Sequence, residues 1–160
     1  MAMTISFVLA GVDDAEAILD LQRLAYQSEA ELYGDFAIPP LLQTLAEMRQ
    51  DVRTQTVVKG LRDGEIVASA RAYEVNGTAY IGRVIVHPCM QGQGIGKLVM
   101  ASIEAQFPNV RRFELFTGHA SLRNLRFYRG LGYADFKTSV VTAALSFVYL
   151  EKMQSPRTAG

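Results

Sequence analysis

The 160-residue chain contains a single cysteine, Cys89, which excludes an internal disulfide and favours a reducing, cytoplasmic location. It also lacks an excess of either charge, because 16 basic residues balance 16 acidic ones. Without a net positive charge, nonspecific attraction to nucleic acid or to an anionic membrane has no electrostatic driving force. The composition therefore predicts that neither nucleic acid nor a membrane is a partner.

Long hydrophobic runs are also missing. The longest, 140–150, is interrupted by Thr142 and Ser146 and is shorter than the roughly 20 residues that a membrane span needs. The apolar patch at 5–9 has no basic residue before it and is followed by Asp13 and Asp14, which argues against a signal peptide.

Internal repeats, low-complexity segments and long linkers are absent as well. With 49% hydrophobic residues, a chain of this length can bury a sizeable core. We therefore expect one domain over residues 1–153, followed by a short C-terminal tail at 154–160.

Hydrophobic spacing and turn residues predict the order of the elements. The expected helices are 13–26, one that begins at Pro39, 95–107 and 121–131, and the segment 29–38 is expected to be irregular. The expected strands are 4–9, 56–61, 65–73, 79–86, 113–117 and two more that end near residue 151. This order predicts an α/β fold with a mixed sheet of about six to seven strands and about four helices, antiparallel at its start and with a strand-helix-strand crossover in its second half.

The dipeptide Asn76-Gly77 is typical of a tight hairpin turn between two of these strands. A two-residue loop there places Tyr73 opposite Tyr80 and Arg71 opposite Gly82.

A glycine-rich segment, Gln91-Gly92-Gln93-Gly94-Ile95-Gly96-Lys97, joins an apolar strand to a helix. Glycines allow a close approach of the backbone to an oxyanion, and the free N–H groups of the first helical turn can bind it. A P-loop is excluded, because Gln91 stands where it needs glycine and Leu98 where it needs Ser or Thr. The dinucleotide fingerprint also fails, because Lys97 takes the place of its third glycine. A tight connection without a ligand is the alternative.

Preceded by Val86-His87-Pro88, this segment resembles the acetyl-coenzyme A loop of the GNAT acyltransferases, whose pattern is Gln/Arg-x-x-Gly-x-Gly/Ala. The segment Leu125-Arg-Phe-Tyr-Arg-Gly-Leu-Gly-Tyr133 resembles the fourth-helix signature of the same family. The expected order of elements agrees with this family over nearly the whole chain. The resemblance implies the GNAT fold, acetyl-CoA as cosubstrate and no metal.

The resemblance also implies that the fourth and fifth strands, ending at Val86 and Thr117, splay apart so that pantetheine pairs with the backbone of Val84 and Val86. The pyrophosphate would then bind the amides of 91–96. The cofactor-binding residues implied in this way are Val84, Ile85, Val86, Gln91, Gly92, Gln93, Gly94, Ile95, Gly96, Lys97, Asn124 and Tyr128.

For catalysis, the resemblance implies that Tyr128 protonates or hydrogen-bonds the departing thiolate of coenzyme A. The alternative is that Tyr128 only packs against the sheet. Ser121, Asn124 and Tyr128 fall at i, i+3 and i+7 and share one helix face. Ser121 stands where many family members have Asn, so the cofactor contact is assigned to Asn124, and Ser121 is expected to be a helix N-cap.

The sequence leaves the identity of the general base open between several residues. The usual family position falls near Tyr80, which would need a water relay. Glu114 faces either the cleft or solvent, and His119 follows the splayed strand. His87 is a further candidate by its position at a strand end.

The acceptor is expected at Glu29, Glu31, Tyr33 and Asp35, because acidic and aromatic groups suit a cationic amine. A solvated acidic loop is the alternative. If Arg71 or Arg83 faced the cleft, either would instead favour an acceptor with a carboxylate.

The predicted function is transfer of the acetyl group of acetyl-CoA to a primary amine of a small molecule or peptide, by direct attack in a ternary complex. Two alternatives stay open: a non-catalytic CoA-binding regulatory module, and an acyltransferase with another acyl donor or a hydroxyl acceptor. The edge of the C-terminal strands also leaves a homodimer open.

Overall fold

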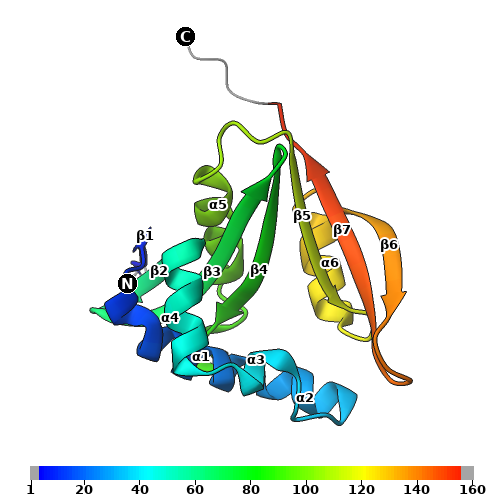
Figure 1. Ribbon diagram of the computed structural model, residues 1–160, viewed down its shortest axis with the longest axis horizontal. Helices are drawn as coiled ribbons and strands as arrows, with labels where there is room; N and C mark the ends of the chain where they lie inside the picture. Colours follow the sequence, from blue (N-terminus) through cyan, green and yellow to red (C-terminus); the bar gives the residue numbers. More distant parts are fainter. Residues whose placement is uncertain (1–3, 156–160) are drawn as a thin grey trace.

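A computed structural model describes residues 4–155 and contains one seven-stranded sheet with the order β1-β2-β3-β4-β5-β7-β6 (Figure 1). The strands are β1 (Ser6–Leu9), β2 (Thr56–Arg62), β3 (Glu65–Val75), β4 (Thr78–Val86), β5 (Arg112–Gly118), β6 (Ala134–Val140) and β7 (Ser146–Met153). β4 and β5 are parallel, and the other neighbouring strands are antiparallel. The predicted mixed α/β fold is confirmed.

The helices are α1 (Ala15–Ala25), α2 (Gln27–Tyr33), α3 (Pro39–Leu42), α4 (Leu45–Thr54), α5 (Ile95–Ala105) and α6 (Leu122–Gly130). The described part of the chain thus has six α-helices where about four were expected. The segment 29–38, predicted to be irregular, begins inside α2. The single helix predicted from Pro39 is in fact α3 and α4, because Thr44 starts a new helix. Its Oγ1 accepts from the N–H of Glu47 at 3.2 Å, and its own N–H donates to the Glu47 carboxylate at 3.0 Å.

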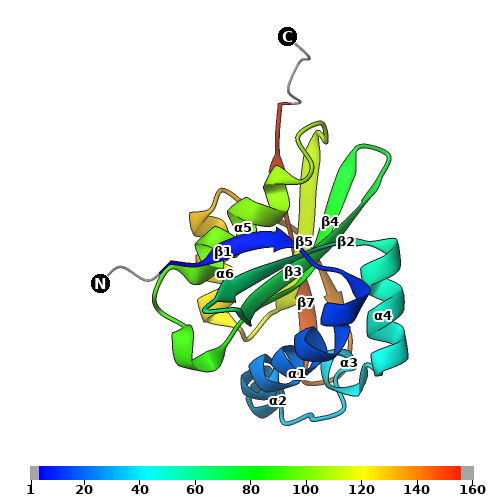
Figure 2. The ribbon, with the colours of Figure 1, turned by 90° about the vertical axis from the view of Figure 1, so that its left-hand side faces the viewer.

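Apolar side chains pack on both faces of the sheet. Val58 of β2 belongs to a cluster with Val99 and Ile103 of α5, whereas its neighbour Val57 belongs to a second cluster with Ile18 of α1 and Met48 of α4. Figure 2 shows α4 and α5 on opposite sides of β2 and β3. β2 is therefore buried on both faces, since successive side chains of a strand point to opposite sides.

β4 and β5 are paired over only a short length. The register is Thr78 with Arg112, Ala79 with Phe113 and Tyr80 with Glu114, after which the two strands separate, although β4 continues to Val86. Figure 1 shows them diverging toward α2 and α3. The predicted splay is confirmed.

The register predicted from Asn76-Gly77 is also confirmed. Tyr73 pairs with Tyr80 and Arg71 with Gly82, and the two tyrosine rings stack at 5.4 Å between centroids. Beyond Arg71 the register shifts by a bulge, in which Arg83 adopts a left-handed backbone with φ of 49°.

Polar contacts hold the molecule together at the end where β4 and β5 are paired. The Glu104 carboxylate of α5 accepts from the Tyr133 hydroxyl at 2.8 Å and from Lys152 Nζ of β7 at 2.7 Å. Gln154, expected as the first tail residue, donates to the carbonyls of Phe107 and Val110. The part of the predicted tail at 156–160 lies outside the described residues.

Over residues 4–155, no helix is both long and apolar enough to span a bilayer. β6 forms one edge of the sheet and is exposed over most of its length. The homodimer expected at this edge stays a prediction.

The core makes a testable prediction at Phe113, a fully buried side chain of β5. Phe113→Ala is expected to lower the free energy of unfolding by about 3–5 kcal/mol, because it removes buried apolar area and leaves a cavity. The matched control is Phe36→Ala, whose side chain is 56% exposed. It should change the value by about 0.5 kcal/mol or less. Urea denaturation of both variants is the measurement, and equal losses would contradict the placement of Phe113 in the core.

Candidate functional site

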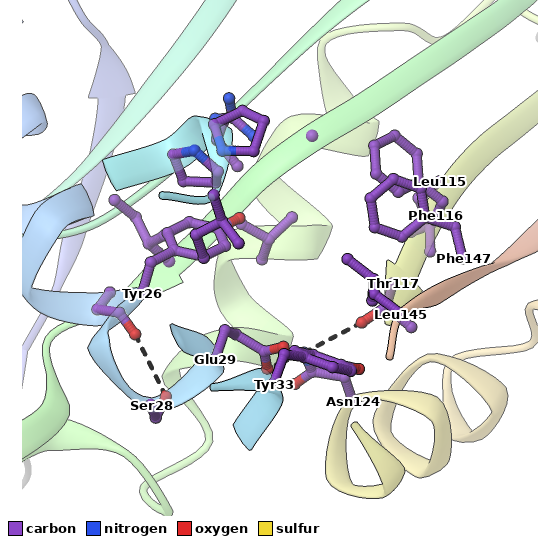
Figure 3. Close-up of a pocket in the computed structure, with 18 of the residues that line it drawn as sticks. Tyr26, Ser28, Glu29, Tyr33, Leu115, Phe116, Thr117, Asn124, Leu145 and Phe147 are labelled. Carbon is purple, nitrogen blue, oxygen red and sulfur yellow. Dashed lines mark hydrogen bonds between the residues drawn. The ribbon is translucent and has the colours of Figure 1, made fainter. Parts of the chain in front are cut away.

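Two adjoining cavities occupy the space between the separated strands. The strand cavity, of about 600 Å³, lies between the second half of β4, β5, the segment from α1 to α3 and the β6–β7 loop (Figure 3). The loop cavity, of about 780 Å³, lies between the glycine-rich loop and α6. The residues that line both are Ser28, Glu29, Val84, Val86, Gln91, Asn124 and Tyr128.

The glycine-rich loop presents a free helix terminus to the loop cavity. Gly92 and Gly94 have φ of 77° and 79°, a backbone region that favours glycine, and α5 starts directly afterwards. No side chain caps this terminus, so its first N–H groups are free to bind an anion. Gly96 is needed for another reason: a Cβ there would lie 3.2 Å from Cζ of Phe127 of α6. The loop thus fits a phosphorylated ligand.

Most of the predicted cofactor-binding residues come together here. The loop cavity is lined by Val84, Val86, Gln91, Gly92, Gly94, Ile95, Gly96, Lys97, Asn124 and Tyr128. Ile85 lines the strand cavity instead, and Gln93 lines neither of the two.

Tyr128 lies where the two cavities meet. Its side chain on α6 is 8% exposed and packs against the rings of Phe127 and Tyr133. Burial raises the pKa of its hydroxyl well above the usual value, and the nearby Tyr26 and Glu29 raise it further. The hydroxyl therefore stays protonated at any physiological pH.

Glu29 of α2 is held against α6. Its Oε1 accepts from the Ser121 hydroxyl at 2.8 Å and from the Asn124 amide at 3.4 Å. Asn124 also donates to Thr117 Oγ1 at 3.3 Å (Figure 3). Ser121 stands at the N-cap position but makes no side-chain capping bond. Ser121 is thus the N-cap residue of α6, as expected, but its hydroxyl donates to Glu29 instead of capping the helix.

The other predicted acceptor residues differ in their surroundings. The Tyr33 hydroxyl accepts from the N–H of Ala120 at 3.0 Å, which fixes α2 to the turn before α6. Asp35 lines the strand cavity and accepts from the N–H of Ala37 at 2.8 Å. Glu31 is exposed and lines neither cavity.

The candidate bases lie elsewhere. Tyr80 stacks on Tyr73 in the paired part of β4, and Glu114 forms an ion pair with Arg112 at 2.8 Å. The ring of His119 accepts from the N–H of Ser146 at 2.9 Å. None of Tyr80, Glu114 and His119 lines either cavity, so the structure does not bring them to Tyr128. His87 lines neither of the two cavities either.

Two further residues of the strand cavity were not among the predicted site residues: Tyr26 had no role assigned from the sequence, and Arg83 was considered only for binding a carboxylate of the acceptor. Tyr26 lines the strand cavity, and burial raises the pKa of its hydroxyl. Arg83 lines the same cavity from the bulge of β4. A basic residue three positions before the strand end was the available signal for Arg83, but the side on which it lies depends on the bulge.

A family model described as the acetyltransferase (GNAT) family matches residues 15–133. The match covers most of the chain, and its two ends fall in α1 and just after α6. The chain therefore belongs to the GNAT family of acetyltransferases. A search of curated proteins gave no match.

Solved structures agree in fold. The PaiA N-acetyltransferase of Thermoplasma acidophilum, in complex with coenzyme A, superimposes with a TM-score of 0.79 at 13% identity and covers 95% of this chain and 100% of its own. The ribosomal-protein-S18-alanine N-acetyltransferase of Escherichia coli gives 0.80 at 14% identity, covering 98% and 97%. The ribosomal-protein-alanine N-acetyltransferase of Brucella melitensis gives 0.76 at 18%, covering 93% and 99%. At these identities the likeness shows the shared fold.

The family uses acetyl-CoA, and the residues present fit it: an uncapped helix terminus faces the loop cavity, and the second half of β4 is unpaired on its β5 side. Within residues 4–155, no group of three or more His, Cys, Asp or Glu side chains is placed to hold a metal ion.

Gly94 gives a test of the loop. Gly94→Val is expected to abolish acetyl-CoA binding, because a β-branched residue strains a φ of 79° and displaces the first amides of α5. Gly64→Val is the matched control, since Gly64 has φ of 80° in the β2–β3 turn. Calorimetric titration with acetyl-CoA should give ordinary affinity for the Gly64 variant, and unchanged affinity in a folded Gly94 variant would refute the placement.

Proposed function

We propose that the protein transfers the acetyl group of acetyl-CoA to the primary amine of a small molecule or peptide, by direct attack while both substrates are bound. The supporting observation is that Glu29 and Tyr128 line both cavities, so two ligands can meet beside them. We further propose that residues 1–153 act as one catalytic domain. We place this domain in the cytoplasm, because a single cysteine suits a reducing compartment.

The cosubstrate would occupy the loop cavity. The amides of 91–96 would bind its pyrophosphate with the N-terminal field of α5 behind them. The unpaired backbone of Val84 and Val86 would hold the pantetheine as an added strand, with Asn124 beside it. Acetyl-CoA supplies an acetyl group activated as a thioester.

Tyr128 would stabilise the sulfur as it leaves. The thiol has a pKa of about 8.5, whereas burial raises the pKa of the Tyr128 hydroxyl far above 10. Since the tyrosine is much the weaker acid, it donates a hydrogen bond to the thiolate rather than giving up its proton. The low-dielectric surroundings strengthen that bond.

Glu29 would serve the acceptor. The Glu29 carboxylate can attract an alkyl ammonium, which has a pKa of about 10 and has to lose one proton to solvent before its nitrogen can attack the acetyl carbon. As the C–N bond forms and the C–S bond breaks, the nitrogen loses a second proton, which the Glu29 carboxylate can accept and later pass to solvent. Coenzyme A leaves as the thiolate and takes up a proton from solvent. We assign no proton transfer to Tyr80, Glu114 or His119, because these residues lie outside both cavities.

The overall test is release of free thiol from acetyl-CoA against a panel of amines. Tight binding of acetyl-CoA with no release to any amine would favour the regulatory module. Release with alcohols, or with longer acyl-CoA thioesters in preference to acetyl-CoA, would favour the other acyltransferases.

The Tyr128 hydroxyl is tested with Tyr128→Phe. We expect the single-turnover rate to fall by about 10²–10³-fold, because one donor to the developing negative charge is lost while the ring still fills its place. Acetyl-CoA affinity should change little. Since the raised pKa keeps the hydroxyl protonated, the wild-type rate should not decline near pH 10 through ionisation of Tyr128. A full single-turnover rate for the Phe variant would remove Tyr128 from the chemistry.

Glu29 is tested with Glu29→Gln, and Glu31→Gln is the matched control on the same helix. The Glu29 variant should lower kcat/KM for cationic amines by about 10²-fold, since it loses both the attraction and the proton acceptor. The Glu31 variant should behave like the wild type, because that side chain is exposed and outside both cavities. The measurement is the steady-state rate of each variant with the same series of amines. Equal effects of the two substitutions would contradict the role of Glu29 and indicate a solvated acidic helix.

A further inference from the structure

The strand cavity contains a positive charge that the protein does not neutralise. Arg83 lines this cavity and forms no ion pair with any residue in the part of the chain described, 4–155. Its Nε is buried and has no hydrogen-bond partner there. The guanidinium carbon lies 5.9 Å from the ring centroid of Tyr26, a contact that orients the group without removing its charge.

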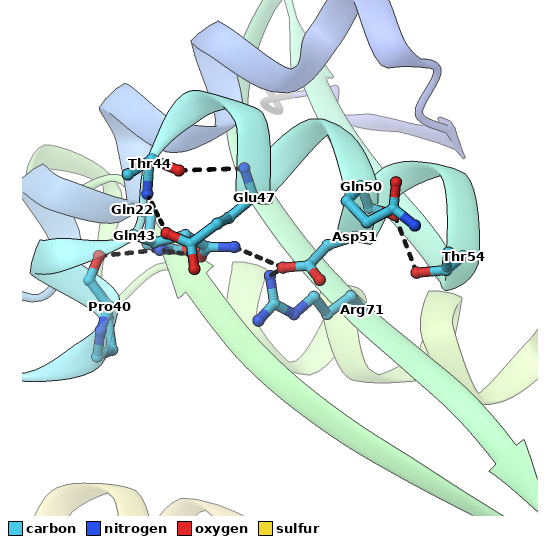
Figure 4. A network of polar contacts seen from close by, with 9 residues as sticks. All are labelled: Gln22, Pro40, Gln43, Thr44, Glu47, Gln50, Asp51, Thr54 and Arg71. Carbon is cyan, nitrogen blue, oxygen red and sulfur yellow. Dashed lines mark hydrogen bonds and ion pairs between the residues drawn. The ribbon is translucent and has the colours of Figure 1, made fainter.

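The carboxylate that pairs with the neighbouring Arg71 is not available to Arg83. Asp51 of α4 accepts from Arg71 Nη1 at 2.7 Å and also from the side-chain amide of Gln43 (Figure 4). Gln43 is held in turn by Gln22, which also donates to the carbonyl of Pro40 at 2.9 Å. Burial lowers the pKa of Arg71, and the charge of Arg83 lowers it further. Two guanidinium groups thus share the region with one carboxylate.

Within residues 4–155, neither acidic side chain of the strand cavity forms an ion pair with Arg83. Glu29 is bonded to Ser121 and Asn124 on α6, and Asp35 to the backbone of Ala37. Gln22 Oε1 is the other buried side-chain atom without a partner in residues 4–155. It is an uncharged amide, which can accept a hydrogen bond but cannot offset a positive charge. The charge of Arg83 is therefore left for a ligand.

Most of the remaining wall is apolar. It is formed by Ile38, Pro39, Pro40, Leu115, Phe116 and Phe147. A ligand that fits this cavity needs an apolar body as well as its charged groups, because contact with an apolar wall is stabilised by the burial of apolar surface.

We propose that Arg83 binds a carboxylate of the acceptor, so that the acceptor is a free amino acid with an apolar side chain rather than a simple amine or the N-terminus of a peptide. This inference rests on the proposed acetyl transfer. Glu29 would face the ammonium of such a ligand and Arg83 its carboxylate. The planar fork of a guanidinium matches a carboxylate with two parallel hydrogen bonds, which a peptide bond or an amide at that position cannot form as well.

The first experiment compares pairs of acceptors that differ in one group: L-phenylalanine, L-leucine and L-methionine against their carboxamides, with 2-phenylethylamine as a third form. Thiol release from acetyl-CoA gives kcat/KM for each. The wild type should prefer the carboxylate in at least one pair by about 10–100-fold, since a hydrogen bond between charged groups contributes that much discrimination. No preference for the carboxylate in any pair would overturn the proposal.

The second experiment changes the arginine. Arg83→Met should remove most of that preference by raising KM for the amino acid and leaving the amide nearly unchanged. Arg83→Lys should restore part of the preference, and Arg83→Asn provides a variant whose side chain tolerates the left-handed backbone at this position. Arg49→Met, at an exposed position on α4, is the control and should keep the wild-type preference. Equal losses with amino acid and amide in the Arg83 variants would overturn the proposal.

A binding measurement separates this inference from the proposed function. The three amino acids are titrated calorimetrically into the wild type and the Arg83→Met variant, each saturated with coenzyme A. Binding that depends on Arg83, without any thiol release in the assay, would leave the carboxylate site standing and refute acetyl transfer to these amines. Thiol release with amines but no binding of an amino acid would refute the carboxylate site alone.

Discussion

The separation of β4 from β5 after Tyr80 and Glu114 is the constraint on which the rest of the site depends. If β4 stayed paired with β5 as far as Val86, β5 would lie against β4 and take up the space that both cavities occupy. The split leaves backbone groups of β4 without a strand partner, and such groups are costly unless something binds them. The bonds of Glu104 to Tyr133 and Lys152 hold the other end closed, so the opening is confined to one side. α5 and α6 then meet across it where Phe127 faces Gly96.

Features set by local backbone chemistry were predictable from the sequence. Asn76-Gly77 fixes a two-residue turn, and the turn fixes which residues of β3 and β4 are opposite each other. The glycine-rich loop is equally local, because strand, turn and helix follow one another within a few residues. The start of α4 was missed, because one helix was expected from Pro39, although Thr44 and Glu47 have the spacing of a capping box. α2 was also missed, because it is seven residues long and buries only Ala30, so it has no apolar stripe to detect.

Residues whose position depends on tertiary structure were harder to predict. Tyr80 and Glu114 are excluded from the cavities only because the strands separate just after them, and no sequence pattern marks that point. Ser121 has the position of an N-cap, yet its hydroxyl bonds to Glu29, which is 92 residues earlier in the chain. Arg83 depends on the bulge, which changes the side on which its side chain lies. For the strand residues and for Ser121 the deciding contact joins segments that are far apart in the sequence, whereas the bulge at Arg83 depends on the pairing of the two strands of one hairpin.

If each cavity holds one ligand, as proposed, the wall that the cavities share would make the two ligands thermodynamically dependent on each other. The Glu29 carboxylate is bonded to Ser121 and Asn124 on the helix that carries Tyr128, so a ligand that shifts one of these groups shifts the wall of the neighbouring cavity. The linkage between two sites is reciprocal: whatever factor one ligand imposes on the affinity for the second, the second imposes on the first. In the proposed ternary complex, the order in which the two substrates bind would therefore not alter the free energy of the complete complex. It would decide which substrate enters a cavity whose wall the other substrate has already positioned.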